Sequence, residues 1–230
     1  MKKVAILTIS TGKYNQLFND FKNSVFDKFL PEYEKRIFVF TDEKYTENTN
    51  VKSIKILHLP WPLNTLLRFN YFNTIQNELK EYDFIYYIDC DIIVHDYINE
   101  EIIPTENQIV AAKHYWFENQ VGTYETENKN SNACVDKSTL SVGNYCQACF
   151  FGAKSQDFIK MNSILDNNVR EDLKKNIIAI WHDESHFNKY ILNTPCIRLH
   201  TGYTHPSIYD IIENRNPVKL LHKNANKLGM

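Results

Sequence analysis

The chain has 230 residues, enough to bury one sizeable hydrophobic core, so one domain is the first expectation. Its 26 basic and 28 acidic side chains give a formal net charge of −2, and no basic cluster stands out, which argues against a nucleic-acid-binding protein. The longest apolar runs are far short of the ~20 residues that cross a bilayer, so no transmembrane segment is expected. The odd number of cysteines, five, favours reduced thiols in a cytoplasmic protein.

Apolar segments rich in β-branched and aromatic residues alternate along the chain with segments of helical periodicity. In chain order, the sequence predicts a strand at 3–10, a helix at 14–29, strands at 36–41 and 53–59, a helix at 64–81, strands at 83–88, 108–113 and 145–151, a helix at 155–173 and a strand at 196–199. This alternation predicts an α/β fold with a mostly parallel sheet and helices on both faces. The polar stretch 118–141 shows little periodicity, and a loop of that length in a compact domain is usually functional or mobile.

An Asp-x-Asp motif, Asp89-Cys90-Asp91, follows directly after the apolar segment 83–88. Open α/β sheets bind their ligands at the carboxyl ends of the central strands, where these carboxylates would lie. Two adjacent carboxylates repel each other unless a cation neutralises them, and Mg²⁺ or Mn²⁺ that also holds a diphosphate would do so. The motif therefore predicts that Asp89 and Asp91 bind a metal in nucleotide-diphosphate chemistry.

Residues 181–190 place two carboxylates, two imidazoles, a hydroxyl, an amide and an ammonium in one short segment. The apolar side chains of this segment predict one buried face of a helix that begins near Asp183. Asp183 and Glu184 would lie in its first turn, where the amide dipoles favour negative charge. Simple capping would explain the acidic pair, but it does not require Trp181 and His182 before it. The segment is therefore a candidate part of an active site.

Two other motifs have structural or alternative explanations. Cys146 and Cys149 have the spacing of a zinc knuckle or redox pair, but strand alternation would send them to opposite faces, so buried thiols are favoured. His182 and His186 have zincin spacing, yet Asp183 stands where that motif needs Glu, which leaves a metallohydrolase as an alternative. We expect the isolated histidines to be surface or packing residues: His58, His95 and His222.

The 181–190 segment resembles the signature of glycosyltransferase family six, which includes the histo-blood-group A and B transferases, the α1,3-galactosyltransferases and shorter bacterial homologues. Further matching segments follow in the family's order: Phe38-Val39-Phe40-Thr41-Asp42, Trp61 with Arg68, Asp89-Cys90-Asp91, Glu101-Ile102-Ile103-Pro104, His114, Thr123-Tyr124-Glu125 and Phe150-Phe151-Gly152. The resemblance implies the GT-A fold as one catalytic domain, residues 1–230. Its nucleotide-binding half would be about 1–95, and its acceptor-binding half, with the C-terminal tail, about 96–230.

The resemblance also implies a reaction: transfer of galactose or N-acetylgalactosamine from a UDP-sugar to the 3-hydroxyl of a β-galactoside or oligosaccharide, with the α configuration retained. Mn²⁺, or Mg²⁺, would be the cofactor, held by Asp89 and Asp91, and Glu184 would lie beneath the anomeric carbon as the catalytic residue. The donor-binding residues implied are Ile9, Thr11, Tyr14, Arg68, Gln147, Ala148, Cys149, His182, Asp183, Lys223 and Lys227. The acceptor-binding residues implied are His114, Thr123, Trp181 and His205.

Retention requires either a carboxylate nucleophile or front-face attack through an oxocarbenium-like ion pair, and Glu184 suits both.

Three segments depart from the family. Gln147-Ala148-Cys149 replaces the glycine-rich donor strand, and a thiol there should crowd an acetamido group, which favours UDP-galactose. His205 replaces an acidic acceptor contact, and Thr126-Glu127 replaces two arginines.

Two other functions compete with this one. A family-eight-like retaining galactosyltransferase also uses a strand-ending Asp-x-Asp, but it needs a second, His-containing metal motif, for which only His200 is a candidate. A non-catalytic sugar-nucleotide or glycan-binding protein is disfavoured because Asp89, Asp91, Arg68 and Glu184 are all present. The expected location is the cytoplasm, with peripheral attachment at the inner face of the membrane as an alternative.

Overall fold

The computed structural model describes residues 1–45, 48–206 and 217–222. Its centre is a seven-stranded sheet with strand order β3-β2-β1-β4-β7-β6-β8. The strands of this sheet are β1 (Lys3–Ser10), β2 (Glu34–Thr41), β3 (Val51–Lys55), β4 (Phe84–Ile88), β6 (Ile109–Lys113), β7 (Cys146–Lys154) and β8 (Cys196–Leu199). Neighbouring strands are parallel except where β7 pairs with β4 and β6. The predicted α/β fold with a mostly parallel sheet is therefore confirmed.

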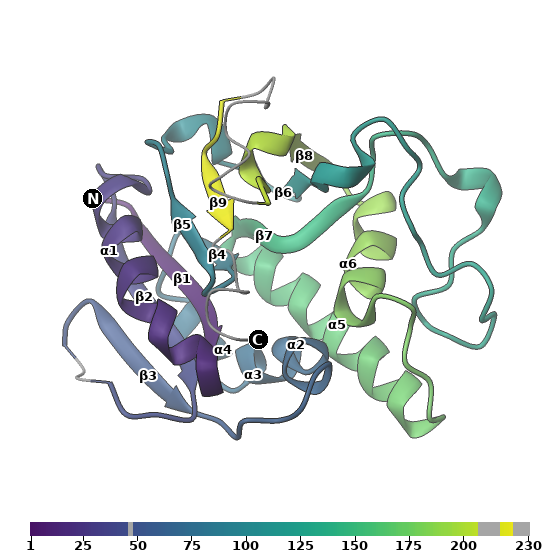
Figure 1. Ribbon diagram of the computed structural model, residues 1–230, viewed down its shortest axis with the longest axis horizontal. Coiled ribbons are helices and arrows are strands. Elements are labelled where there is room, and N and C mark those ends of the chain that lie inside the picture. The colour runs from purple at the N-terminus through teal and green to yellow at the C-terminus, as the bar shows by residue number, and fades with distance from the viewer. Residues whose placement is uncertain (46–47, 207–216, 223–230) are drawn as a thin grey trace.

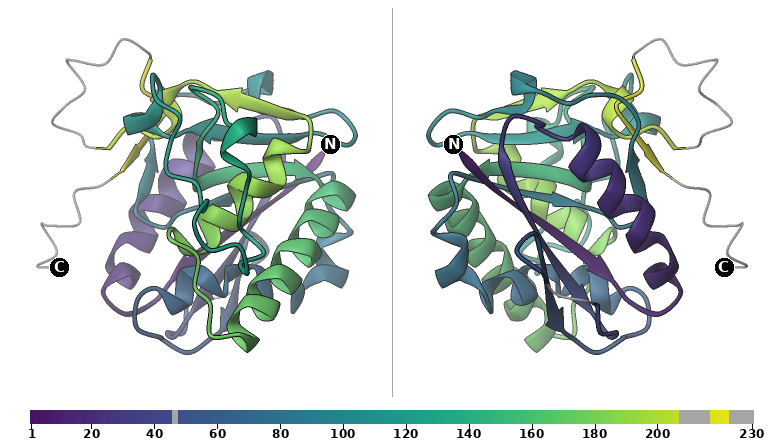
Figure 2. Two further views of the ribbon diagram at one scale, coloured as in Figure 1. Left: turned by 90° about the vertical axis from the view of Figure 1, so that its right-hand side faces the viewer. Right: turned by 90° about the vertical axis from the view of Figure 1, so that its left-hand side faces the viewer.

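Helices cover both faces of this sheet (Figures 1 and 2). One face carries α1 (Phe18–Lys28) and a small antiparallel sheet of β5 (Ile92–Val94) and β9 (Leu220–His222). The other face carries α2 (Leu63–Leu66), α3 (Arg68–Asn73), α4 (Gln76–Leu79), α5 (Ser155–Lys174) and α6 (His182–Leu192). Short 3-10 helices are η1 (Gly12–Leu17), η2 (Glu100–Ile102), η3 (Tyr115–Phe117), η4 (Lys137–Thr139) and η5 (Thr201–Tyr203).

The pleat of the strands divides the hydrophobic interior into two cores. In β4, Phe84, Tyr86 and Ile88 pack on the α1 side, whereas Ile85 and Tyr87 pack on the α5 side. Successive side chains of a strand point to opposite faces, so a strand buried on both sides is apolar throughout. This explains why the segment before the Asp-x-Asp motif is continuously apolar. Among the described helices, none is both long enough and apolar enough to cross a membrane.

Several predicted element boundaries were wrong. The helix predicted at 14–29 begins as η1 and becomes α-helical only at Phe18. The helix predicted at 64–81 is three short helices, because the backbone leaves helical geometry at Leu67 and again at Ile75 (φ −118°, ψ 14°). Asn and Thr side chains, frequent in this segment, compete for backbone hydrogen bonds and weaken helices; the Thr74 hydroxyl, for example, donates to the Tyr71 carbonyl.

The strands differed from expectation in three places. The strand predicted at 53–59 is β3, which ends at Lys55, and the chain beyond it passes along a cavity. The predicted strand 145–151 continues to Lys154 as β7. β5 and β9 were not predicted, since three residues are too few to establish an alternating pattern.

The long polar stretch 118–141 is anchored by two buried carboxylates. Asp172 of α5 accepts hydrogen bonds from the Ser131 hydroxyl (2.6 Å) and from the Asn132 backbone N–H (2.7 Å). Glu125, within the stretch, accepts from the Ile180 N–H (3.0 Å), directly before Trp181. The stretch is thus attached both to α5 and to the segment that leads into α6.

Candidate active site

Two adjoining cavities lie at the carboxyl ends of β1 and β4. The smaller, about 180 Å³, includes Ile9, Thr11, Tyr14, Asp89 and Asp91 in its lining. The larger, about 400 Å³, includes Arg68, Asp89, His114, Gln147, Ala148, Cys149, Trp181, His182, Asp183 and Glu184. Trp61, Thr65 and Asp89 line both cavities, so they form one continuous site. Most residues singled out by the sequence therefore meet here, from segments far apart in the chain.

Arg68, the first residue of α3, is the buried cation at the centre of this site. Its Nη1 donates to the Ala148 carbonyl (2.6 Å), and its Nε forms an ion pair with Asp183 Oδ2 (3.0 Å). Its guanidinium lies over the Tyr87 ring, 4.4 Å from the centroid, and Nη1 lies 3.9 Å from Asp89 Oδ1. Burial alone would lower the pKa of Arg68, but the nearby acidic groups, Asp183 above all, raise it above its usual value. Arg68 thus stays cationic and connects α6 to the Asp-x-Asp motif.

Glu184, in the first turn of α6, has both carboxylate oxygens held by hydrogen bonds. The Tyr145 hydroxyl donates to Oε1 (2.8 Å), and the Ala148 N–H donates to Oε2 (2.9 Å). Burial raises the pKa of Glu184 to about 7, although both hydrogen bonds oppose that shift. The carboxylate therefore has a fixed orientation and titrates near neutral pH. Tyr145 was missed because nothing in the sequence distinguishes it from a core aromatic residue.

The two residues before Glu184 complete the acidic end of the larger cavity. Asp183 is buried, and burial raises its pKa to about 6 despite the opposing charge of Arg68. His182 has a φ of +48°, in the left-handed region that non-glycine residues rarely adopt. Its ring packs edge-on against Trp61, with centroids 4.7 Å apart. His182 is thus held in a strained backbone conformation at the start of α6 and lines the larger cavity.

The Asp-x-Asp pair has the donor chemistry of a divalent-metal site. The Tyr87 hydroxyl donates to Asp89 Oδ1, and His222 Nδ1 lies 3.8 Å from Asp91 Oδ1. Burial raises the pKa of Asp89; Arg68 opposes the shift and the charge of Asp91 adds to it. A buried carboxylate that is further destabilised by a neighbouring carboxylate fits a site for a hard cation. No three His, Cys, Asp or Glu side chains in the described ranges are grouped so that they could hold a metal ion.

Two expected site residues in the described part of the chain do not line these cavities. His205 is 0% exposed and packs edge-on against Tyr115 (5.4 Å between centroids), so its position does not support the expected acceptor contact. Thr123 is absent from both cavity linings, because Gly122 and Tyr124 pack its segment against Tyr145. Lys223 and Lys227 lie outside the described residues.

The isolated histidines were partly misjudged. His222 was expected to be a surface or packing residue, but the β5–β9 pairing sets it opposite Ile92 and hence beside Asp91. His58 lines the smaller cavity.

Among the expected acceptor residues, His114 lines the larger cavity, and burial lowers its pKa to about 4. Trp116, which the sequence did not single out, lies exposed at the same cavity.

The zinc alternatives do not agree with the positions of their residues. Cys146 and Cys149 contribute to the cores on opposite faces of β7, as strand alternation predicted, so they cannot share a metal ion. His186 faces α5, where its Nε2 lies 3.6 Å from Asp172 Oδ2, whereas the ring of His182 contacts Trp61. The two histidines therefore face different surroundings.

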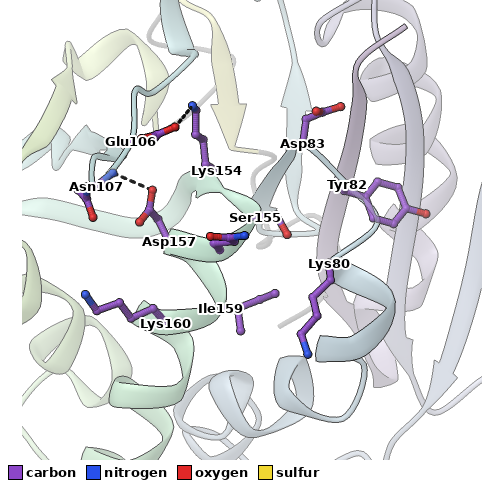
Figure 3. Close-up of a pocket in the computed structure, with 11 residues that line it drawn as sticks. Lys80, Tyr82, Asp83, Glu106, Asn107, Lys154, Ser155, Asp157, Ile159 and Lys160 are labelled. Atoms are coloured by element: carbon purple, nitrogen blue, oxygen red, sulfur yellow. Dashed lines mark hydrogen bonds and ion pairs between the residues drawn. The ribbon is translucent and has the colours of Figure 1, made fainter.

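A third cavity, about 730 Å³, lies at the amino end of β4, the end opposite to the Asp-x-Asp motif, and Figure 3 shows residues that line it. It is bordered by Asp83, directly before β4, and by Ser155, the first residue of α5. Three lysines and three carboxylates line it, and they include the pair Lys154–Glu106 (3.4 Å). None of the residues predicted from the sequence to be functional lines it. Its balanced charge and its distance from the motifs indicate a surface hollow rather than the active site.

Comparison with known proteins agrees with this geometry. The sequence profile of glycosyltransferase family 6 matches residues 2–207. The chain is 32% identical over 211 residues to the O-antigen biosynthesis glycosyltransferase WbnI of Escherichia coli, covering 90% of this chain and 89% of that protein. It is 21% identical over 199 residues to globoside alpha-1,3-N-acetylgalactosaminyltransferase 1 of Gallus gallus, a match that covers 82% of this chain and 57% of that protein. It is 28% identical over 112 residues to histo-blood group ABO system transferase 2 of Rattus norvegicus, a match that covers 49% of this chain and 33% of that protein.

Proposed function

Since this chain belongs to glycosyltransferase family 6, we propose that it transfers galactose from UDP-galactose to the 3-hydroxyl of a β-galactoside, forming an α1,3 linkage with retention. The observation that carries the proposal is Glu184: a carboxylate fixed by Tyr145 and Ala148, in a cavity continuous with the Asp-x-Asp motif. Family membership also removes the family-eight alternative. The proposed acceptor is a growing surface oligosaccharide, since the Escherichia coli relative is named for O-antigen biosynthesis, and the proposed location is the cytoplasm.

In this proposal the nucleotide occupies the smaller cavity and the donor sugar occupies the larger one. Asp89 and Asp91 would hold Mn²⁺ or Mg²⁺, which when bound neutralises charge on the leaving diphosphate. Arg68 fixes the spacing between those carboxylates and α6 through Asp183. The bond between the anomeric carbon and the UDP oxygen breaks, and its electron pair leaves with UDP. The ionised Glu184 faces the positive charge that develops at the anomeric carbon.

The acceptor enters from the side of the larger cavity that carries exposed aromatic rings. Trp116 is 63% exposed and Trp181 is 44% exposed, although both are large apolar side chains. Flat aromatic surfaces at a cavity mouth suit the apolar face of a sugar ring, and His114 adds a polar contact there. The acceptor 3-hydroxyl then attacks the anomeric carbon, and its proton passes to the diphosphate oxygen that has left with UDP. Retention follows from attack on the face that UDP leaves, or from two displacements through Glu184.

We expect kcat/KM to fall as the pH is lowered through about 7. Glu184 must be ionised to face the developing cation, and burial raises its pKa to about 7, so the protonated, inactive fraction grows below that pH. The Tyr145 hydroxyl stabilises the ionised form, so Tyr145→Phe should move the acidic limb to higher pH. The measurement is the pH profile of kcat/KM at saturating metal.

Tyr124→Phe is the matched control for this pH experiment. Its ring packs against Tyr145 (4.9 Å between centroids), and its hydroxyl has no hydrogen-bond partner among the described residues. The control should leave the acidic limb where it is. An unmoved limb in Tyr145→Phe would contradict the assignment of this limb to Glu184.

UDP-galactose is expected to be the better donor, with lactose as a model acceptor and UDP release as the readout. Cys149 lines the sugar cavity, and a thiol leaves less room than glycine for an acetamido group. Cys149→Gly should therefore shift the ratio of kcat/KM values toward UDP-N-acetylgalactosamine by ~5-fold or more, since steric exclusion of a few atoms is worth ~1–3 kcal/mol. NMR of the product tests the α1,3 linkage.

Cys146→Gly makes the same change on the opposite face of β7 and should leave the donor ratio unaltered. A native preference for UDP-N-acetylgalactosamine, or no shift in Cys149→Gly, would show that this strand does not determine the donor. The broader proposal fails if neither donor gives acceptor-dependent UDP release.

A further inference from the structure

The exposed ring of Trp181 at the larger cavity is carried by a short turn between α5 and α6. The turn closes where the His182 N–H donates to the Ala179 carbonyl (2.9 Å). Ala179 is buried, whereas Ile180 and Trp181 are both exposed. Exposed apolar side chains remove little surface from water, so they do little to hold this turn in place. Hydrogen bonds to its backbone therefore carry more of its positioning.

Glu125 provides such a contact on the N-terminal side of Trp181. This residue belongs to the long loop 118–141 and is only 7% exposed. Its Oε2 accepts from the Ile180 N–H (3.0 Å), while its Oε1 accepts from the N–H groups of Glu127 (3.2 Å) and Asn128 (3.0 Å). Hydrogen bonds to an ionised carboxylate are stronger than those between neutral groups. One carboxylate thus joins the loop to the residue directly before Trp181.

The C-terminal side of Trp181 is held within α6 itself. The buried Ser185 hydroxyl accepts from the Trp181 N–H (3.0 Å), and the Ser185 N–H donates to the Trp181 carbonyl (3.2 Å). The backbone is therefore fixed on both sides of this exposed ring. One side is fixed by the helix and the other by Glu125.

The reacting end of the cavity is held by other partners. Asp183 forms its ion pair with Arg68 (3.0 Å), and Glu184 accepts from the Tyr145 hydroxyl (2.8 Å) and from a backbone N–H of β7 (2.9 Å). None of these partners belongs to the long loop. A change at Glu125 should therefore affect the turn before α6 without releasing the two carboxylates that begin the helix.

We propose that Glu125 is a positioning residue for the acceptor: its carboxylate fixes the turn that presents the Trp181 ring to the acceptor sugar. It takes no part in donor binding or in cleavage of the donor. Without this carboxylate the Ile180 N–H loses its acceptor, and the ring is no longer held where it aligns the acceptor hydroxyl with the anomeric carbon. This inference rests on the proposed function, in which Trp181 contacts the acceptor.

The test compares Glu125→Ala with the native protein in two assays: transfer from UDP-galactose to lactose, and hydrolysis of UDP-galactose by water when no acceptor is present. The KM for lactose should rise by ~10-fold or more, the scale of one lost hydrogen bond to a charged group, while the hydrolysis rate and the Kd of UDP stay within ~2-fold. Glu127→Gln is the matched control. This exposed carboxylate of the same loop pairs with Lys137 (2.6 Å), and its loss should leave the KM for lactose unchanged.

A double-mutant cycle shows whether Glu125 acts through Trp181. Trp181→Ala should itself raise the KM for lactose, and adding Glu125→Ala should raise it no further, since the turn then has no ring to position. Independent, additive effects would overturn the proposal. So would an unaltered KM for lactose in Glu125→Ala, or a hydrolysis rate that falls together with transfer.

If Glu125→Ala does not fold, Glu125→Gln provides the second test. Glutamine has one carbonyl oxygen, which can accept from the Ile180 N–H or from the N–H groups of the loop, but not from both. The KM for lactose should therefore still rise, and an unchanged value would overturn the proposal.

The proposed function is tested independently of this role. A native protein that transfers galactose to lactose, with a KM for lactose that does not respond to changes at Glu125, refutes the positioning role alone. A native protein without acceptor-dependent UDP release refutes the proposed function, and the positioning role with it.

Discussion

Glu184→Gln is expected to lower kcat by on the order of 10³-fold while the affinity for UDP changes little. Removing one preorganised charge or donor from a reacting centre has an effect of this scale. Glutamine keeps the size of the side chain, and its carbonyl oxygen can still accept from the Ala148 N–H. The substitution removes the negative charge that faces the anomeric carbon. Residue 184 is not part of the lining of the nucleotide cavity, so UDP binding should be preserved.

Steady-state kinetics and UDP calorimetry on one preparation would measure the two effects. Glu106→Gln is the matched control, since this carboxylate lies in the cavity at the amino end of β4 and pairs with Lys154 (Figure 3). The control should retain the native kcat. An unchanged kcat in Glu184→Gln would leave Glu184 with a structural role at the start of α6.

The second large effect is expected for Asp91→Asn, which should reduce kcat/KM by more than ~100-fold because a metal contributes several kcal/mol to charge stabilisation. Asp91 is the better position to change. Asp89 lies near Arg68 (3.9 Å) and accepts from Tyr87, so replacing it would also disturb a buried cation. Excess EDTA should stop turnover by the native protein, and Mn²⁺ should restore it.

Binding of Mn²⁺ in the presence of UDP, followed by electron paramagnetic resonance, gives a readout that does not depend on turnover, and it should weaken in Asp91→Asn. Asp96→Asn is a suitable control, since Asp96 is an exposed carboxylate that pairs with Lys219 (2.8 Å). Full turnover of the native protein in excess EDTA would refute the metal requirement.

Several residues that line the candidate site could be identified from short segments of sequence, because local order places them at the ends of strands and helices. Asp89 and Asp91 follow an apolar strand, and a strand that is buried on both faces must present its next residues at the sheet edge. Asp183 and Glu184 lie in the first turn of α6, which begins at His182, one residue before the start that the apolar periodicity predicted. Long, strongly patterned elements such as α5 were predicted with nearly correct ends.

Contacts between distant segments were decided only by the tertiary structure. Tyr145 and His222 look like core, surface or packing residues in the sequence. Their partners are not indicated by the order of the chain. The hydroxyl of Tyr145, directly before β7, donates a hydrogen bond to Glu184 of α6, and the pairing of β9 with β5 brings His222 close to Asp91. The sequence likewise did not indicate that His205 packs against Tyr115, or that Tyr124, next to Thr123, packs against Tyr145. Sequence periodicity reports which face of an element is buried, whereas the neighbour that covers this face is selected by the packing of the whole chain.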